Sequence, residues 1–142
     1  MPLKKPLKIF LVNDNAFCIA MEQQLLFHYG YADISVFTSS SSCFNSLALQ
    51  PDVILLDVNM ESDGMGILKK IKNTNPDIYV VVLSFAEENA TAEIALQLGA
   101  FDFIIREEKT GEKLSKVLLK IEQIQSMLGD NSGSIFKRPG TN

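Results

Sequence analysis

Short apolar runs alternate with stretches of helical periodicity five times along the chain. The runs are Lys8–Val12, Ile34–Phe37, Asp52–Asp57, Ile78–Leu83 and Phe101–Ile105. The third and fourth runs, DVILLD and IYVVVL, are almost wholly apolar, which is typical of strands that are covered on both faces. The pattern therefore predicts an α/β fold in which five strands form one parallel sheet between layers of helices.

A helix is predicted after each of these strands. The helical stretches are Ala16–Tyr29, a short one near Phe44–Ala48, one with Ile67, Leu68 and Ile71 on one face, Glu87–Leu98, and a last one with the stripe Leu114, Val117, Leu118, Ile121 and Leu128. Gly30 and Gly99 are placed to end two of the helices, and Thr110 is placed to cap the start of the last one. Because crossovers between parallel strands are right-handed, a doubly wound (β/α)5 arrangement is the simplest solution.

The periodic part of the chain predicts one domain, over residues 7–128. A chain of 142 residues is too short to give two domains with substantial cores of their own. Residues 129–142 are rich in Gly, Ser and Asn and have no period, which indicates a flexible tail or the start of a linker. The sequence leaves open whether the domain is free-standing or the front piece of a longer chain.

The charge distribution argues against direct binding to nucleic acid. Five of the 13 basic residues lie at the two ends, so eight basic residues face 17 acidic ones in between. No apolar run approaches the roughly 18 residues that a membrane span requires, and the N-terminal apolar stretch is too short for a signal peptide. The two cysteines and the single His28 are too few for the usual zinc or Cys/His sites. We therefore expect a cytoplasmic protein without membrane contact.

Polar side chains follow four of the five predicted strands, at the edge where open parallel sheets bind their ligands. They are Asn13 and Asp14 after the first strand, Asp57 and Asn59 after the third, Ser84 after the fourth and Arg106 after the fifth. Oxygen ligands of this kind suit Mg²⁺, and a hydroxyl and a guanidinium are natural donors to a phosphoryl group. The set predicts a carboxylate that accepts phosphate with the assistance of a metal.

These motifs resemble the receiver domain of two-component response regulators, over about Leu7–Leu128. The resemblance rests on Val12-Asn13-Asp14, on Asp52–Met60 (DVILLDVNM) followed by Asp63-Gly64, on Ser84, on Gly99-Ala100 and on Phe103. It implies a CheY-like, flavodoxin-like fold and phosphorylation of Asp57 by a sensor histidine kinase or a phosphotransfer protein. Mg²⁺ would be held by Asp14, Asp57 and the backbone carbonyl of Asn59.

The resemblance also implies a switch from Ser84 to Phe103. If phosphoryl oxygens draw in the Ser84 hydroxyl, Phe103 can turn inward and the surface of the fourth and fifth helices changes. In the family this surface often forms a homodimer. The chain would have no enzymatic activity beyond its own phosphorylation and dephosphorylation.

The sequence departs from the family pattern at several of these positions. Asn13 stands where the family usually has a second acid, and Arg106-Glu107 replaces a lysine followed by proline. Phe85 follows Ser84 where a small residue is usual, and the loop at residues 61–64 lacks the usual proline. These departures keep open a degenerate receiver that acts as an interaction module without phosphorylation.

Each candidate residue also has a structural alternative. Asp57 could simply end its strand, Asp14 could cap the first helix, and Asn13 could form an Asx-turn or orient a metal-bound water. Arg106 could pair on the surface with Glu107, Glu108 or Asp102, and Phe103 could be a core residue.

An enzyme on the same fold is disfavoured. A flavodoxin needs a glycine-containing phosphate loop after the first strand, which residues 13–17 lack, and a haloacid dehalogenase phosphatase needs Asp-x-Asp there.

Overall fold

Strands and helices alternate along the chain in the computed structural model, which describes residues 6–58, 64–85 and 89–132. The elements are β1 (Ile9–Val12), α1 (Ala16–His28), β2 (Ile34–Phe37), α2 (Ser40–Asn45), a short 3₁₀ turn (Leu47–Leu49), β3 (Val53–Asp57), α3 (Gly64–Thr74), β4 (Tyr79–Ser84), α4 (Asn89–Gln97), β5 (Asp102–Ile105) and α5 (Thr110–Ser132). All five predicted strands are present.

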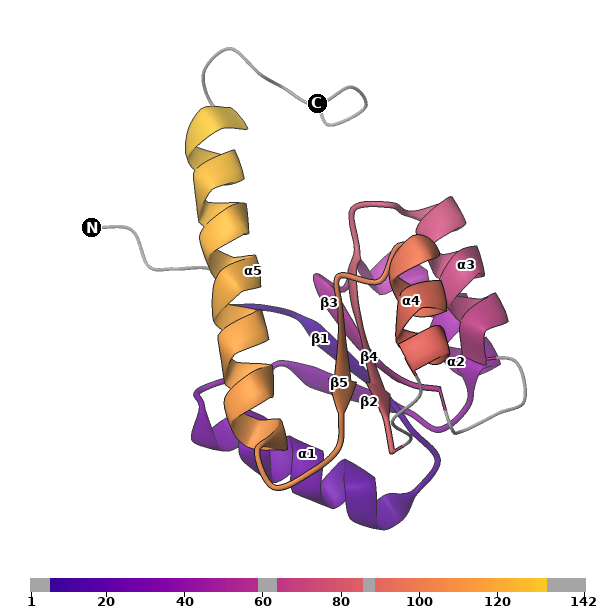
Figure 1. Cartoon of the computed structure of the whole chain (residues 1–142). Coiled ribbons are helices and arrows are strands. Elements are labelled where there is room, and N and C mark those ends of the chain that lie inside the picture. The colour runs from indigo at the N-terminus through magenta and orange to yellow at the C-terminus, as the bar shows by residue number, and fades with distance from the viewer. Residues whose placement is uncertain (1–5, 59–63, 86–88, 133–142) are drawn as a thin grey trace.

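The five strands form one parallel sheet in the order β2-β1-β3-β4-β5. Figure 1 shows α1 and α5 on one face of the sheet and α2, α3 and α4 on the other. The predicted doubly wound, five-stranded α/β fold in a single domain is therefore confirmed.

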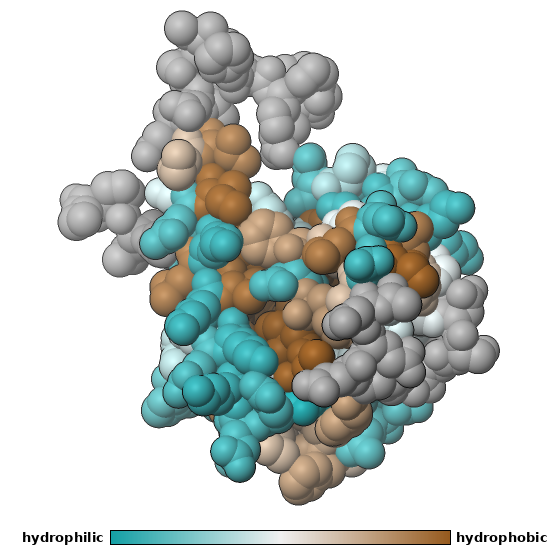
Figure 2. Space-filling view, in the orientation of Figure 1, coloured by the Kyte–Doolittle hydropathy of each residue, from teal (hydrophilic) through white to brown (hydrophobic). Residues whose placement is uncertain are grey.

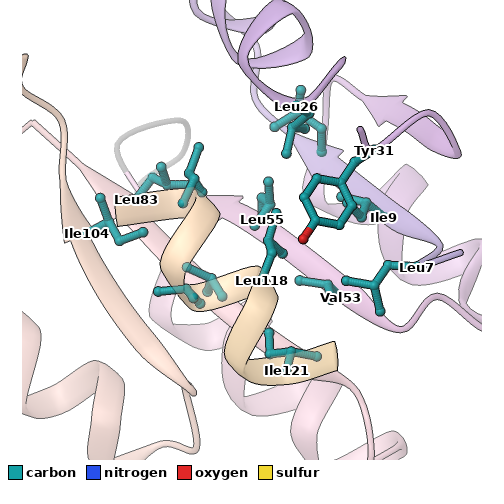
Figure 3. Packing of buried hydrophobic residues seen from close by; sticks show 14 residues of the cluster. Leu7, Ile9, Leu26, Tyr31, Val53, Leu55, Leu83, Ile104, Leu118 and Ile121 are labelled. Atoms are coloured by element: carbon teal, nitrogen blue, oxygen red, sulfur yellow. The ribbon is translucent and has the colours of Figure 1, made fainter. Parts of the chain in front are cut away.

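Alternate residues of each central strand face opposite helical layers. In β3, Val53 and Leu55 belong to the core under α1 and α5, whereas Ile54 and Leu56 belong to the core under α2, α3 and α4. In Figure 3, Leu118 and Ile121 of α5 lie over the sheet residues of the first core. Because both sides of β3 are covered, the whole run is buried, which explains why it shows no polar alternation.

Several helix ends differ from the predicted boundaries. The N-cap of α2 is Ser39, whose hydroxyl accepts the N–H of Ser42, so this helix begins within the serine stretch, earlier than the predicted Phe44–Ala48. Thr110 is the first residue of α5, and its hydroxyl bonds both the N–H and the carbonyl oxygen of Glu107. The last helix continues past Leu128 to Ser132, and residues 133–142 lie outside the described part of the chain.

Both cysteines lie in the interior as small apolar residues. Cys18 and Cys43 are free thiols, and burial raises the pKa of Cys43 to about 12. His28 is the last residue of α1. Within the described ranges, no helix combines the length and apolar character that crossing a membrane requires.

Candidate functional site

The strand register brings the predicted polar residues to one edge of the sheet. Val12 of β1 lies beside Leu56 of β3, so the next residues, Asn13 and Asp57, follow neighbouring strands at the same level. On the other side of Asp57, the strand β4 ends at Ser84.

Pairing between the last two strands continues one residue beyond β5. The N–H of Arg106 donates to the carbonyl oxygen of Ser84 at 2.7 Å, and this bond fixes where the arginine leaves the sheet. Asn59 falls in the range 59–63, outside the described residues.

Asp57 is a buried carboxylate at the carboxyl end of β3. Its Oδ1 accepts a hydrogen bond from Nη1 of Arg106 at 3.2 Å.

The chain beyond β3 passes very close to the start of α3: a Cβ at Gly64 would lie 2.9 Å from the Cα of Val58. A glycine is therefore required at residue 64 for α3 to begin beside the acceptor strand.

Asp14 is exposed and does not cap the first helix. The N-cap of α1 is Asn15, whose Oδ1 accepts the N–H of Cys18 at 3.0 Å. The capping alternative for Asp14 is therefore wrong, and its role as a metal ligand stays a prediction.

Asn13 is fully buried and forms the Asx-turn that was one of its two alternatives. Its Oδ1 accepts the N–H of Asn15 at 2.9 Å, a bond that also fixes the orientation of the amide group. Its Nδ2 makes no hydrogen bond of ordinary geometry within the described part of the chain, although the amide lies close enough to the Cys18 thiol to act against the rise that burial causes in the pKa of that thiol. A buried amide donor without a hydrogen bond of good geometry is costly, so Asn13 keeps an N–H that can donate to an acceptor.

Arg106 is held in the interior by two acids from different elements. Its Nε lies 2.7 Å from Oε2 of Glu22 in α1, its Nη2 lies 3.5 Å from Oε1 of Glu22, and its Nη1 contacts Asp57. Burial alone would lower the pKa of Arg106, but hydrogen bonding and attraction from Glu22, together with Asp57, raise it above its ordinary value. The arginine is therefore a permanent positive charge beside the acceptor.

The surface alternative for Arg106 is wrong. Its side chain is only 7% exposed, and the nearby Glu107 pairs instead with Lys113. The Asp102 carboxylate accepts the N–H of Phe103. The arginine instead pairs with the buried acids Glu22 and Asp57, whose carboxylates its planar guanidinium contacts through separate nitrogens.

Glu22, which is buried in the middle of α1, was not among the predicted site residues. A signal was present in the spacing, because Cys18, Glu22 and Leu26 recur every four residues and form the buried side of that helix. An acid within such an apolar stripe needs a cation as partner.

Ser84 is buried at the end of β4, whereas Phe103 in β5 is half-buried and packs against the core under α2, α3 and α4. The alternative that Phe103 is a core residue is therefore confirmed in part, because the side chain is half-buried in this core. The switch roles of both residues stay predictions.

A cleft of about 250 Å³ opens beside Arg106, between α1 and the segment that joins β5 to α5. Phe17 and Met21 form an exposed apolar wall of the cleft, and Glu22 and Arg106 also line it. Phe85 is 60% exposed, and its ring centroid lies 4.9 Å from Cζ of Arg106. The bulky residue after Ser84 therefore stacks on the arginine.

The residues present fit the predicted Mg²⁺ ion. Asp14 and Asp57 follow adjacent strands, and Mg²⁺ is commonly held by one or two carboxylates together with water and phosphate oxygens. No cluster of three or more His, Cys, Asp or Glu side chains that could hold a metal occurs among the described residues, and such a Mg²⁺ site does not need one.

The sequence profile of the response regulator receiver domain matches residues 9–118. Curated relatives include a protein-glutamate methylesterase/protein-glutamine glutaminase of Leptospira interrogans, 34% identical over 75% of this chain and 32% of the relative. The transcriptional regulatory protein ZraR of Salmonella typhimurium is 27% identical over 98% of this chain and 32% of its own length. The chain thus spans about a third of the length of these curated relatives.

Solved structures give the same result for the fold. A response regulator receiver domain protein from Clostridium thermocellum has a TM-score of 0.76 and 25% identity, over 86% of this chain and 98% of that one. A beryllofluoride-activated DrrB receiver domain has a TM-score of 0.72 at 22% identity, over 84% of this chain and 99% of that one.

Replacing Arg106 by methionine is expected to destabilise the protein strongly. The change leaves the buried carboxylates of Glu22 and Asp57 without their cation, a loss of about 3–5 kcal/mol in the free energy of unfolding. Chemical denaturation measures this loss. Lys113→Met is the control, because the Lys113–Glu107 pair is more than 40% exposed on both sides and its loss should change little. Equal effects of the two substitutions would contradict the buried pairing.

Proposed function

This chain belongs to the response regulator receiver domains, and we propose that it accepts a phosphoryl group on Asp57 from a sensor histidine kinase or a phosphotransfer protein. The observation that carries the proposal is the buried Asp57 carboxylate at the carboxyl end of β3, with the Arg106 guanidinium 3.2 Å away. An exposed strand-end aspartate with no cation beside it would not support this chemistry.

In the proposed transfer, a carboxylate oxygen of Asp57 attacks the phosphorus of a phosphohistidine on the partner. The new P–O bond forms as the P–N bond breaks, and the departing imidazole keeps the electron pair and takes up a proton. Arg106 neutralises charge on the phosphoryl oxygens, and the Ser84 hydroxyl donates to one of them. Hydrolysis of the acyl phosphate later restores the carboxylate.

Asp14, Asp57 and the backbone carbonyl of Asn59 would hold Mg²⁺ in this site. When bound, the ion supplies positive charge that offsets repulsion between the carboxylates and the incoming phosphoryl group. Asn13 contributes a neutral amide instead of a second acid, so the ligand set carries less negative charge than the usual pattern.

We further propose that the signal passes through α4, β5 and α5, where a second copy of the chain binds weakly. Exposed apolar side chains support this assignment: Ile94 and Leu96 on α4, and Leu119, Met127 and Leu128 on α5, are 46–66% exposed. Figure 2 shows apolar patches over α4 and over the C-terminal part of α5 on this face. The edge strand β5 lies between the two helices (Figure 1).

No other reaction is proposed for this chain. The methylesterase and transcriptional functions in the names of the curated relatives describe proteins about three times as long.

Two unpaired cysteines in the interior suit the reducing cytoplasm in which we place the protein.

Incubation with acetyl phosphate and Mg²⁺ is expected to add one phosphoryl group, and Asp57→Asn should abolish the addition. The amide is a poor nucleophile, whereas the overall shape of the side chain is kept. Intact-mass measurement gives the result, with Asp33→Asn as the control at an exposed aspartate before β2. A wild-type mass that never shifts, or an equal shift in Asp57→Asn, would contradict phosphorylation at Asp57.

Asn13→Asp is expected to tighten Mg²⁺ binding about tenfold. Two unit charges about 4 Å apart interact by roughly 4 kcal/mol at an effective dielectric of about 20, and screening through a bridging water leaves about 1–2 kcal/mol. Aspartate keeps the bond to the N–H of Asn15 and places a second oxygen where Nδ2 makes no hydrogen bond of ordinary geometry within the described part of the chain. Calorimetric titration with Mg²⁺ measures the affinities.

A matched control for this titration is Asn75→Asp. Asn75 accepts the N–H of Asp77, two residues on, in the same kind of Asx-turn but at the end of α3. Its substitution adds the same charge and should leave the Mg²⁺ affinity unchanged. If Asn13→Asp and wild type agree within about twofold, Asn13 does not face the metal.

Beryllofluoride, which mimics the phosphoryl group, is expected to strengthen self-association through α4 and α5. Leu96→Glu on α4 should abolish this gain because it buries a charge in the interface, whereas Phe27→Glu on the exposed side of α1 should not. Sedimentation with and without the mimic reports the dimer fraction. An unchanged monomer fraction in the wild type would count against dimer formation on this surface.

A further inference from the structure

Glu22 is a buried acid for which the proposed phosphotransfer has no use. Its side chain is 4% exposed, and it projects from the middle of α1 between the buried positions Cys18 and Leu26. An ionised carboxylate in such a place is strongly unfavourable unless a cation and hydrogen bonds compensate it. The cation is Arg106, whose backbone is 84 residues away in sequence.

The two acids bind different nitrogens of the Arg106 guanidinium. The carboxylate of Glu22 accepts hydrogen bonds from Nε (2.7 Å, to Oε2) and Nη2 (3.5 Å, to Oε1), and Oδ1 of Asp57 accepts one from Nη1 at 3.2 Å. All three nitrogens are therefore engaged. A guanidinium can serve two carboxylates in this way because its donors point in fixed directions from one plane.

Phe85 adds a third restraint on the same group. Its ring lies 4.9 Å from Cζ of Arg106, so the guanidinium is fixed by hydrogen bonds to the two acids and by an aromatic contact. Each contact comes from a different part of the chain: Glu22 from α1, Asp57 from β3, and Phe85 from the residue after β4.

We propose that Glu22 is a positioning residue that holds Nη1 of Arg106 against the acceptor oxygen of Asp57. This inference rests on the proposed phosphorylation of Asp57. With Glu22 in place, the arginine side chain is already ordered when a phosphoryl oxygen arrives. A long flexible side chain without such a contact loses conformational entropy when it binds the phosphoryl group. Without it, the arginine can leave the acceptor for the open cleft.

In the presence of Glu22, an arginine at position 106 can stay in contact with Asp57, whereas a lysine cannot. A lysine ammonium is one nitrogen on a flexible stem and cannot keep the two-nitrogen contact with Glu22 while it contacts Asp57. Beside Glu22 a lysine would be drawn away from the acceptor. Once Glu22 is removed, the same lysine has Asp57 as its only buried acid within the described contacts of Arg106.

Four proteins test the inference: wild type, Glu22→Met, Arg106→Lys and the double variant. The measured quantity is the rate of phosphorylation by acetyl phosphate with Mg²⁺, followed by intact mass. We expect each single variant to be slower by about tenfold, the usual size of an effect on a group that orients a reacting residue. The double variant should be faster than Arg106→Lys, because its lysine is no longer divided between two acids.

This recovery separates positioning from a general loss of folding. A purely structural role for Glu22 would make the double variant no better than either single one. Glu22→Gln keeps one acceptor oxygen and should show a smaller loss in the same direction, which preserves the test if Glu22→Met folds poorly. Glu108→Gln removes an exposed acid nearby and should react at the wild-type rate.

A second measurement does not depend on phosphorylation. The Nε–H of Arg106 should exchange slowly with water in ¹⁵N NMR spectra of the wild type, because it is bonded to a buried carboxylate. In Glu22→Met it should exchange at least about tenfold faster. Equal exchange in the two proteins would overturn the inference.

The rates distinguish a failure of the positioning role of Glu22 from a failure of the phosphorylation of Asp57. Glu22→Met phosphorylated as fast as wild type, within about twofold, or a double variant no faster than Arg106→Lys, overturns the positioning role alone. A wild-type protein that takes no phosphoryl group overturns the proposed function, and this inference with it.

Discussion

The sharing of one guanidinium between two buried carboxylates constrains the whole functional edge of the sheet. Glu22 and Asp57 come from a helix and a strand on either side of Arg106, and neither acid is tolerable in the interior without the cation. The three-residue contact therefore ties α1 and β3 to the chain segment after β5. It also holds α1 against Arg106, so that the cleft lined by Phe17 and Met21 opens beside the arginine.

The fold was predictable because the apolar pattern of each strand indicates whether one or both of its faces are covered. Every residue of Val53–Asp57 is buried, and a run without polar alternation has few other interpretations. The boundaries of the helices were less predictable. Ser39 lies in a serine-rich stretch typical of a loop, yet its hydroxyl caps α2. Gly129 has open space around it, and α5 continues through it to Ser132 because the docked part of the helix has already paid the cost of nucleation.

The candidate site was predictable only where it follows strand ends. Asp57, Ser84 and Arg106 each come directly after, or at the end of, an apolar run, and the parallel topology then brings them together. The partner of Arg106 was not predictable in this way, because Glu22 lies within a helix and 84 residues away. Phe85 and Arg106 look like two separate departures from the receiver pattern in the sequence, whereas in the structure one side chain stacks on the other.

The distribution of charge connects these departures with each other. Asn13 stands where the receiver pattern has a second acid, so the Asp57 side of the site has one negative charge fewer, and Glu22 places a negative charge on the Arg106 side. Asp57 therefore has one acid fewer beside it to bind a metal, and the cation that contacts it, Arg106, is itself bound to Glu22. Lysine has one nitrogen for both contacts, whereas arginine has three. An arginine at position 106 can therefore contact Glu22 and Asp57 at the same time, and the aromatic ring of Phe85 suits the flat head of that arginine.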